Sequence, residues 1–575
     1  MEVSVESGYC PSTGIYHSKW DSPVLPPHQN PSLSLPSFLL SHLPPRSLHK
    51  PAFIDSKSGD SITFQELRSL TVAVAHSLRS LGVKKGDVVL VVSPNFLHFP
   101  LLVLGVMHAG GIFSTANPLN TRLEFHAQTQ DSNPVLILTS REFKPKLDGL
   151  ISKPVVLVEE FINEVLVQSS SRQPCTSAAF PNVVTTQAAA NPAALMYSSG
   201  TTGKSKAVVC SHGNLIAMSG LLRHVWDAEG GASDETYLCV VPLFHMFGLS
   251  VLVLGTVSVR ATTVILRKYS MEEMLRAVED HRVTRLPVVP PIVLQLLRYR
   301  DWLKGFELGS LKEVICSGAP LGRDDMERFS KYYPHLILSQ CYGLTETNGP
   351  ITFCNGISGR IHVSIGRLIP FMEAKIIDVR SQKSLPPLKH GELCVRGPPV
   401  MQGYFKNQEA TSQAIDNEGW LHTGDLCFID TFGLVYIIDR IKELIKYKAY
   451  QVAPAELEEI LSAHPDVNDV AVIPYPDEEA GEIPMACVVK REASKIKEGD
   501  IITFVAGKVA PYKKVRRVVF VEAIPRSPSG KILRRHLKAL YTHQRMEISP
   551  RYLLQLSPWI SGLGQQMKGL FGRLS

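Results

Sequence analysis

Residues 63–92 read TFQELRSLTVAVAHSLRSLGVKKGDVVLVV, and this stretch is the most informative about the fold. Thr63 and Glu66 have the spacing of a helix-capping box, and apolar side chains then recur at helical spacing before Gly82 can end the helix. The uninterrupted apolar run Val88–Val92 is typical of a short strand that is buried on both faces. The stretch therefore predicts a helix followed by a buried strand.

The same alternation continues beyond this stretch. A second apolar helix fits Leu97–His108, and another short buried strand fits Val135–Leu138. Strands alternating with helices predict an α/β fold in which parallel sheets are covered by helices. Such sheets bind their ligands at the loops beyond the strand ends, so we expect the chemistry to lie in loops.

Length and composition limit the class of protein. A chain of 575 residues is too long for one hydrophobic core, so at least two domains are expected. With 44% apolar and 20% charged residues, the composition excludes a disordered or fibrous chain. The net charge of +7 suits phosphate-bearing ligands but is too small for a nucleic-acid binder. The ten cysteines form no C-x-x-C pair, which argues against a disulfide scaffold or a zinc site.

One segment raises the question of a membrane span. Residues 240–259 carry His245 as their only ionisable group, a length and polarity that could cross a bilayer. Because Pro242, Gly248 and Gly255 interrupt the run, we favour a buried core segment and expect no integral membrane span. Residues 1–20 lack the features of a signal peptide, and residues 1–50 predict an irregular wrap on the first domain.

Basic side chains concentrate at residues 439–448, and this change in composition marks a domain boundary. Beyond it the pattern predicts a small α/β unit. Its expected helices are Ala455–Leu461 and Asp500–Val509, and its expected strands are Val470–Ile473, Ala486–Val489 and Val515–Val521.

Residues 198–206, SSGTTGKSK, follow the apolar run Ala193–Met196 and have the composition of a phosphate-binding loop. Glycines permit tight turns, hydroxyl and amide groups donate to phosphate oxygens, and lysines supply charge. A Walker A motif would need glycine where Ser198 stands, so a P-loop ATPase fits poorly. Taken alone, the segment could equally be a flexible polar surface loop.

Further motifs occur in a fixed order: YSSGTTG at 197–203, YGLTE at 342–346, GELCVRG at 391–397, GWLHTGD at 419–425, Asp439–Arg440 and PSGKIL at 528–533. With these motifs the chain resembles the adenylate-forming superfamily of acyl-CoA synthetases, adenylation domains and luciferases. Within it, the chain is most similar to the plant 4-coumarate:CoA ligases and their ligase-like relatives. The resemblance spans roughly residues 30 to 545.

The resemblance implies two domains of α/β type. The first, at 1–439, would hold parallel sheets covered by helices together with a β-rich part and would bind AMP. The second, at 440–545, would be a small mobile C-terminal domain, followed by a disordered or amphipathic tail at 546–575.

The resemblance also implies which residues bind ATP and Mg²⁺. The phosphate contacts would come from Ser198, Ser199, Gly200, Thr201, Thr202, Gly203 and Lys206. Thr345 would meet the α-phosphate, and Glu346 would hold Mg²⁺, a cation that prefers oxygen ligands. Asp425 would accept hydrogen bonds from both ribose hydroxyls, and Arg440 would help to hold the nucleotide.

Catalytic and CoA-binding roles follow from the same resemblance. Lys531 would bridge the substrate carboxylate and the α-phosphate, and His245 would contact that carboxylate. Lys442 would lie at the hinge between two poses of the C-terminal domain. The residues implied for the thioester-forming pose are Lys446 and Gln451, and those implied for CoA are Lys268, Lys448 and the Ala449 position, where the family has glycine.

The acyl pocket is implied to include Phe247, Ser317, Gly318, Gln340 and Cys341. Ligases that favour 4-coumarate commonly carry a tyrosine at the Phe247 position and a lysine at the Ile315 position. Their absence argues against tight selection of a 4-hydroxylated ring, because hydrogen-bonding sites discriminate strongly for their partner.

We therefore expect an ATP-dependent carboxylic acid:CoA ligase that uses ATP, Mg²⁺ and CoA. The substrate would be a fatty acid, a jasmonate precursor or an aryl or cinnamic acid. Two alternatives stay open: acyl transfer to a carrier protein, and a non-catalytic binder of acyl-AMP or CoA. Residues 572–575 are not a Ser-Lys-Leu-type signal, so the cytoplasm is expected, with the peroxisome as the alternative. The oligomeric state is left open.

Overall fold

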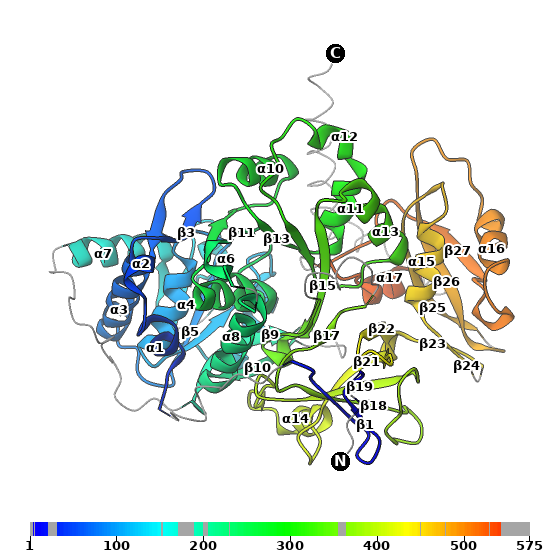
Figure 1. The fold of residues 1–575 in the computed structure, drawn as a ribbon, viewed down its shortest axis with the longest axis horizontal. Helices are drawn as coiled ribbons and strands as arrows, with labels where there is room; N and C mark the ends of the chain where they lie inside the picture. The colour runs from blue at the N-terminus through cyan, green and yellow to red at the C-terminus, as the bar shows by residue number, and fades with distance from the viewer. Residues whose placement is uncertain are drawn as a thin grey trace. The chain divides into compact units, whose positions relative to one another are not determined.

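The structure is a computed structural model of the 575-residue chain. It describes residues 4, 6–20, 32–150, 153–170, 189–198, 205–228, 230–354, 364–448, 450–477, 479–527 and 530–541. The chain forms two compact units (Figure 1). Unit 1 comprises Met1–Lys442 with Pro528–Lys531, and unit 2 comprises Glu443–Ser527 with Ile532–Ser575. The expected tail at 546–575 lies outside the described residues.

The helix and strand predicted from residues 63–92 are present. Helix α3 (Phe64–Ser80) begins at a capping box, in which the Glu66 amide donates to Thr63 Oγ1 at 3.2 Å and the Thr63 amide donates to Glu66 Oε2 at 2.8 Å. Strand β5 (Val88–Val92) is buried at every position. Helix α4 (Phe99–His108) packs against α3, and Gly105 permits this contact because a Cβ there would lie 2.2 Å from Val74 Cγ1.

Strand β5 lies inside a seven-stranded sheet of unit 1. The strand order is β20 (Gly403–Tyr404), β10 (Lys206–Ser211), β9 (Pro192–Ser198), β6 (Ile112–Thr115), β5, β7 (Leu136–Thr139) and β8 (Val155–Leu157). Strands β5 to β9 pair in parallel, whereas β10 runs antiparallel to β9 and β20 antiparallel to β10. The predicted α/β class is therefore confirmed, and the phosphate-loop segment connects the antiparallel neighbours β9 and β10.

A nine-stranded sheet supplies a second part of unit 1. Its order is β17 (Arg367–Leu368), β16 (Gly349–Phe353), β15 (Ile337–Leu344), β14 (Glu313–Cys316), β13 (Arg285–Val288), β11 (Thr236–Cys239), β12 (Thr262–Ile265), β3 (Pro51–Asp55) and β4 (Ser61–Thr63). The strands from β15 to β3 along this order pair in parallel. Helices follow its strands: α10 (Met271–Asp280), α11 (Pro290–Arg298) and α13 (Arg323–Tyr332).

The third sheet of unit 1 corrects the expectation for residues 1–50. Strands β1 (Tyr9–Cys10) and β2 (Ile15–His17) form a hairpin that extends an antiparallel sheet. The remaining strands are β18 (Glu373–Ile377), β19 (Gly391–Arg396), β21 (Leu421–Ile429) and β22 (Val435–Arg440). Two-residue and three-residue strands carry almost no periodicity, so local sequence does not reveal them; the pairing with β18 decides them.

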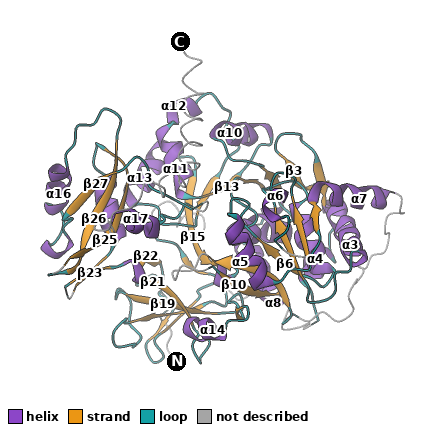
Figure 2. Ribbon diagram, turned by 180° about the vertical axis from the view of Figure 1, so that it is seen from behind, coloured by secondary structure: helices purple, strands orange, loops and turns teal. Residues whose placement is uncertain are grey.

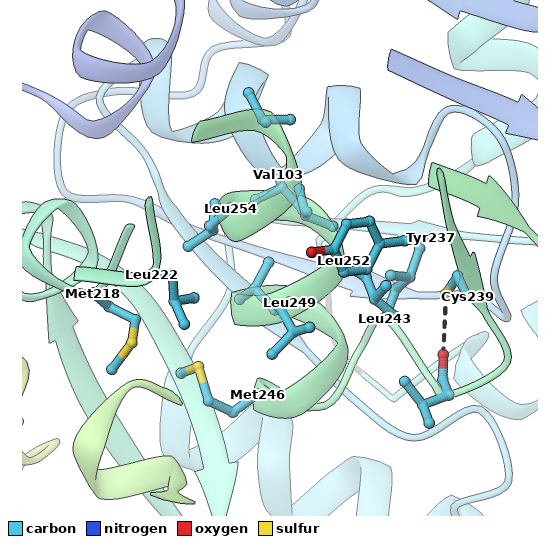
Figure 3. Close-up of a cluster of buried hydrophobic side chains, with 14 of the residues drawn as sticks. Val103, Met218, Leu222, Tyr237, Cys239, Leu243, Met246, Leu249, Leu252 and Leu254 are labelled. Atoms are coloured by element: carbon cyan, nitrogen blue, oxygen red, sulfur yellow. Dashed lines mark hydrogen bonds between the residues drawn. The ribbon is translucent and has the colours of Figure 1, made fainter. Parts of the chain in front are cut away.

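Residues 240–259 form a buried core segment, as predicted. Residues Gly248–Gly255 form a π-helix, η3, which continues into α9 (Thr256–Val259). Figure 3 shows Leu249 of η3 beside Leu222 of α8 (His212–Trp226), and Leu252 of η3 beside Tyr237. Gly248 permits a close approach, because a Cβ there would lie 2.2 Å from the Pro242 carbonyl oxygen. No helix among the described residues is both long enough and apolar enough to cross a membrane.

Unit 2 has its own mixed sheet (Figure 2). The order is β24 (Tyr450–Val452), β23 (Ile445–Tyr447), β26 (Gly481–Lys490) and β25 (Val467–Asp477), and β27 (Arg517–Phe520) pairs in parallel with β26. Alternate residues of β25 belong to different cores: Val470 and Val472 pack with α15 (Pro454–Ser462) and α16 (Glu498–Ala506), whereas Ala471 and Ile473 pack with α17 (Arg534–Tyr541). Helices therefore cover both faces of this sheet.

Candidate active site

Asp425 and Arg440 come together as the resemblance implies. The two residues are opposite each other in the antiparallel pair β21–β22, and Arg440 Nε lies 3.1 Å from Asp425 Oδ1. Tyr342, on β15, donates its hydroxyl to Asp425 Oδ2 at 2.6 Å. Asp425 is only 2% exposed, so its carboxylate depends on these partners rather than on solvent. Burial, followed by the Asp425 charge, raises the pKa of Tyr342 well above its ordinary value and keeps the phenol protonated as a donor.

The predicted magnesium ligand is held by a second tyrosine. Glu346 lies in the short 3₁₀-helix η4 (Thr345–Thr347) together with Thr345, and Tyr404 of β20 donates its hydroxyl to Glu346 Oε1 at 2.9 Å. Burial and the Glu346 carboxylate raise the pKa of Tyr404, so the phenol remains a donor. Lys206 Nζ lies 4.9 Å from the centroid of the Tyr404 ring, within cation–π range. One carboxylate beside a phosphate-binding loop fits Mg²⁺, which usually takes a few carboxylates and completes its shell with water and phosphate oxygens.

The phosphate loop is anchored at both ends in the seven-stranded sheet. Ser198 ends β9 and is opposite Lys206, which begins β10. The Ser198 hydroxyl oxygen is buried and has no hydrogen-bond partner among the described residues, as expected of a group that awaits a ligand. Ser199, Gly200, Thr201, Thr202 and Gly203 lie outside the described residues, so their predicted contacts stay predictions.

His245 is poised as a neutral side chain immediately before η3. The Phe247 amide donates to His245 Nδ1 at 3.3 Å, which leaves Nε2 as the protonated nitrogen. Burial, together with the smaller effect of the positive charge of Lys531, lowers the pKa of His245 to about 4. Lys531 belongs to unit 1, although Ser527 and Ile532 on either side belong to unit 2. His245 and Lys531 therefore share one electrostatic environment, with the imidazole uncharged at neutral pH.

The predicted acyl-pocket residues gather where β14 ends beside β15. Cys316 of β14 is opposite Gln340 of β15, and Ser317 donates its hydroxyl to the Cys341 carbonyl at 2.8 Å. Gly318 has a φ of +87°, so a side chain at this turn would be strained. Gln340 Nε2 donates to the Ser364 carbonyl at 3.3 Å. Burial raises the pKa of the Cys341 thiol to about 12, so Cys341 remains a neutral wall residue.

The residues implied for CoA are divided between the two units. Lys446 is opposite Gln451 in the β23–β24 pair of unit 2, and its amide donates to Glu482 Oε2 at 2.8 Å. Lys448 forms an ion pair with Glu479 at 2.8 Å. In unit 1, Lys268 and Lys442 are both exposed. Ala449 lies outside the described residues, and the roles of this group stay predictions.

Sequence reasoning missed Tyr342 and Tyr404 as functional residues. Tyr342 is the first residue of the YGLTE motif, so its position in a motif was the available signal. Tyr404 carries no such signal, because only the pairing of β20 with β10 brings it to Glu346. The chain divides after Lys442, whereas the expected boundary lay between residues 439 and 440.

We predict that His245 titrates far below the ordinary histidine value in the free protein. Burial disfavours the imidazolium, so the folded protein should bind this proton only near pH 4. Because the unfolded chain binds it near pH 6.5, His245 should reduce stability progressively as the pH falls from about 6.5 towards 4. Imidazole C2 hydrogen exchange, read by mass spectrometry on the peptide that contains His245, measures the midpoint. A midpoint near 6.5 would contradict the prediction, and exposed His536 in α17 is the control.

Comparisons with known proteins identify the family of the chain. The model of the AMP-binding enzyme family matches residues 44–405, and that of the AMP-binding enzyme C-terminal domain matches residues 456–531. Peroxisomal OPC-8:0-CoA ligase 1 of Arabidopsis thaliana is 42% identical, with 94% of this chain and 98% of the relative aligned. The 4-coumarate–CoA ligase-like protein 4 of Oryza sativa subsp. japonica is 43% identical, with the same coverage of 94% and 98%.

The comparison with solved structures indicates the same family. ATP-bound MatB from Rhodopseudomonas palustris is 26% identical with a TM-score of 0.80, and the match covers 89% of this chain and all 100% of MatB. The o-succinylbenzoate-CoA synthetase MenE from Bacillus subtilis, in complex with its acyl-adenylate intermediate, is 27% identical with a TM-score of 0.75 and coverage of 88% and 98%. The chain belongs to the family of AMP-binding, adenylate-forming enzymes, among the plant 4-coumarate:CoA ligase-like proteins.

Proposed function

We propose that the chain is an ATP-dependent carboxylic acid:CoA ligase, which forms an acyl-adenylate and then an acyl-CoA thioester. The observation that carries this proposal is the buried Asp425 carboxylate, aimed by Arg440 and Tyr342, in a chain of the AMP-binding enzyme family. The named CoA ligases among its relatives support transfer of the acyl group to the thiol of CoA.

In the first half-reaction the substrate carboxylate attacks the α-phosphorus of ATP, and the bond to pyrophosphate breaks. Asp425 would accept hydrogen bonds from both ribose hydroxyls, because an ionised carboxylate is purely an acceptor and suits hydroxyl donors. Ser198, Lys206 and the loop between them would bind the phosphates. Glu346, held by Tyr404, would bind Mg²⁺, which neutralises phosphate charge.

Lys531 would stabilise the negative charge that develops at the α-phosphate. A fixed cation at this point lowers the barrier without a proton transfer. A neutral His245 can donate through Nε2 to the substrate carboxylate, so it orients the nucleophile without protonating it.

In the second half-reaction the CoA thiolate attacks the acyl carbonyl, and AMP leaves with the pair of electrons of the broken C–O bond. Lys446 and Gln451 would act in this step, and Lys268, Lys448 and the Ala449 segment would contact CoA. The division of the chain after Lys442 supports a hinge there, which would let one site serve both steps in turn.

The acyl pocket supports an apolar acid. Phe247 and Ile315 offer no hydrogen bond to a ring hydroxyl, and Ile315 is only 1% exposed in β14. One relative is named an OPC-8:0-CoA ligase, which favours a jasmonate precursor or a fatty acid as the substrate class. Cinnamic and other aryl acids are the alternative.

Substrate preference tests this assignment. We expect the kcat/KM for OPC-8:0 or straight-chain acids to exceed that for 4-coumarate at least ~10-fold, because the Phe247 and Ile315 side chains offer no hydrogen bond to the 4-hydroxyl. AMP release with CoA over a panel of straight-chain acids, OPC-8:0, benzoate, cinnamate and 4-coumarate measures it. The highest efficiency on 4-coumarate would contradict the apolar-pocket assignment, and no AMP release with any acid would contradict the ligase itself.

Replacing Lys531 separates a ligase from a binder. In Lys531→Ala we expect acyl-adenylate formation to fall ~100-fold or more, because the cation at the developing charge is lost. Thioester formation from a synthetic acyl-adenylate should fall less than ~10-fold, because that step does not use the lysine. Pyrophosphate release and thioester formation measure the two steps. Equal losses in both steps would contradict the role, and Arg535→Ala, a basic exposed neighbour in α17, is the matched control.

We propose a cytoplasmic location, with the peroxisome as the alternative because one relative is named peroxisomal. A fluorescent protein fused to the N-terminus leaves the C-terminus free for receptors. A diffuse signal in plant cells is expected, and spots that coincide with a peroxisomal marker would contradict it.

A further inference from the structure

The motif at residues 391–397 has no role in the site described above, and in the motif at 419–425 only Asp425 has one. Residues 391–397 lie on β19 and residues 419–425 end on β21, and the two strands pair antiparallel in the six-stranded sheet. The register shifts between Glu392 and Cys394, so that Cys394 is opposite His422 and Glu392 is opposite Leu426. This irregularity is a bulge in β21, and it brings the Glu392 side chain to Gly424, directly before Asp425.

Both carboxylate oxygens of Glu392 contact residues of this bulge. Oε1 accepts a hydrogen bond from the Gly424 amide at 3.1 Å, and Oε2 lies 3.1 Å from His422 Nδ1. The Glu392 side chain is only 15% exposed, which protects these contacts from competition by solvent. Gly424 has a φ of +71°, a conformation that a non-glycine residue rarely adopts, and the carboxylate fixes its amide directly before Asp425.

Thr423 holds the same bulge through its hydroxyl group. Its hydroxyl donates to the Leu393 carbonyl at 2.7 Å and accepts from the Asp425 amide at 3.1 Å. The backbone on each side of Gly424 is therefore tied to β19. The direction of the Asp425 side chain is set by this backbone, together with Tyr342 and Arg440.

His422 holds Glu392 in place. The hydrogen bond to Glu392 raises the pKa of His422 despite partial burial, and Asp416 contributes, with Oδ2 lying 3.9 Å from Nε2. Cys394 Sγ lies 3.4 Å from His422 Nδ1, and Lys375 acts electrostatically on Cys394. When the imidazole is protonated, it gives Glu392 a charge-assisted hydrogen bond, which is shorter and stronger than a neutral one.

We propose that Glu392 is a positioning residue for ribose recognition: it fixes the bulge at Gly424 in β21 that aims the Asp425 carboxylate, and His422 orients Glu392. The proposal rests on the proposed function, in which Asp425 binds the ribose hydroxyls. It predicts that loss of Glu392 weakens recognition of the hydroxyls specifically, because a misaimed carboxylate forfeits those two hydrogen bonds and no others.

The test compares ATP with 2′-deoxy-ATP and 3′-deoxy-ATP in acyl-adenylate formation by the full chain at saturating acid. The wild-type protein should prefer ATP in kcat/KM, and Asp425→Asn should abolish most of that preference. Glu392→Ala should reduce the preference by ~10-fold, chiefly through the KM for ATP, with the KM for the acid unchanged. Glu392→Gln keeps the shape and one acceptor for the Gly424 amide, so it should retain an intermediate preference and provides the second variant if Glu392→Ala does not fold.

Glu373→Ala is the matched control. Glu373 lies on β18 of the same sheet and likewise pairs with a histidine, with His17 Nδ1 at 3.3 Å, and with Arg396 at 2.7 Å. Its loss should leave the preference for ATP unchanged. An equal loss of activity on ATP and both deoxy analogues in the Glu392 variants would overturn the positioning role. If Asp425→Asn keeps the wild-type preference, the proposed ribose contact fails instead.

Metal binding by Glu392 and its neighbours is the competing outcome of this test. Donor atoms of Glu392, Cys394 and His422 all lie within 4.8 Å of one another, a grouping that could hold a transition metal. Stoichiometric zinc or copper in the purified wild-type protein that disappears in Glu392→Gln would make the carboxylate a metal ligand and overturn the proposal. We expect metal analysis of both proteins to give the same trace content.

Discussion

A buried carboxylate, Asp425, constrains the arrangement of unit 1. At 2% exposure it requires charged and polar partners, and these come from separate elements: Arg440 on the adjacent strand and Tyr342 on the nine-stranded sheet. The six-stranded and nine-stranded sheets therefore meet at this group.

The surrounding groups hold their protons in the states that adenylation needs. His245 is neutral because burial and Lys531 disfavour its charged form, and Tyr342, Tyr404 and Cys341 stay protonated because they are buried. Donors therefore face carboxylates at Asp425 and Glu346, and the fixed positive charge is left to lysine and arginine. Catalysis by preorganised charge, rather than by proton transfer, suits attack on a phosphate.

Local patterns predicted much of the fold. The capping box at Thr63 and the buried strand Val88–Val92 both form, because backbone hydrogen bonding and apolar burial act over a few residues. The expected buried segment at 240–259 also forms, although the apolar run did not reveal that residues Gly248–Gly255 are π-helical. The hairpin β1–β2 escaped prediction because strands this short exist only through their pairing with β18.

The sequence by itself determined the α/β class and the family, and its ordered motifs predicted Asp425, Arg440, Glu346 and Lys531 as site residues. Only the tertiary structure decided which other side chains orient these site residues. Tyr404 reaches Glu346 through the pairing of β20 with β10, and Glu392 reaches Gly424 through an irregularity between β19 and β21. Residues separated by tens or hundreds of positions meet through sheet register, which no local period of the sequence encodes.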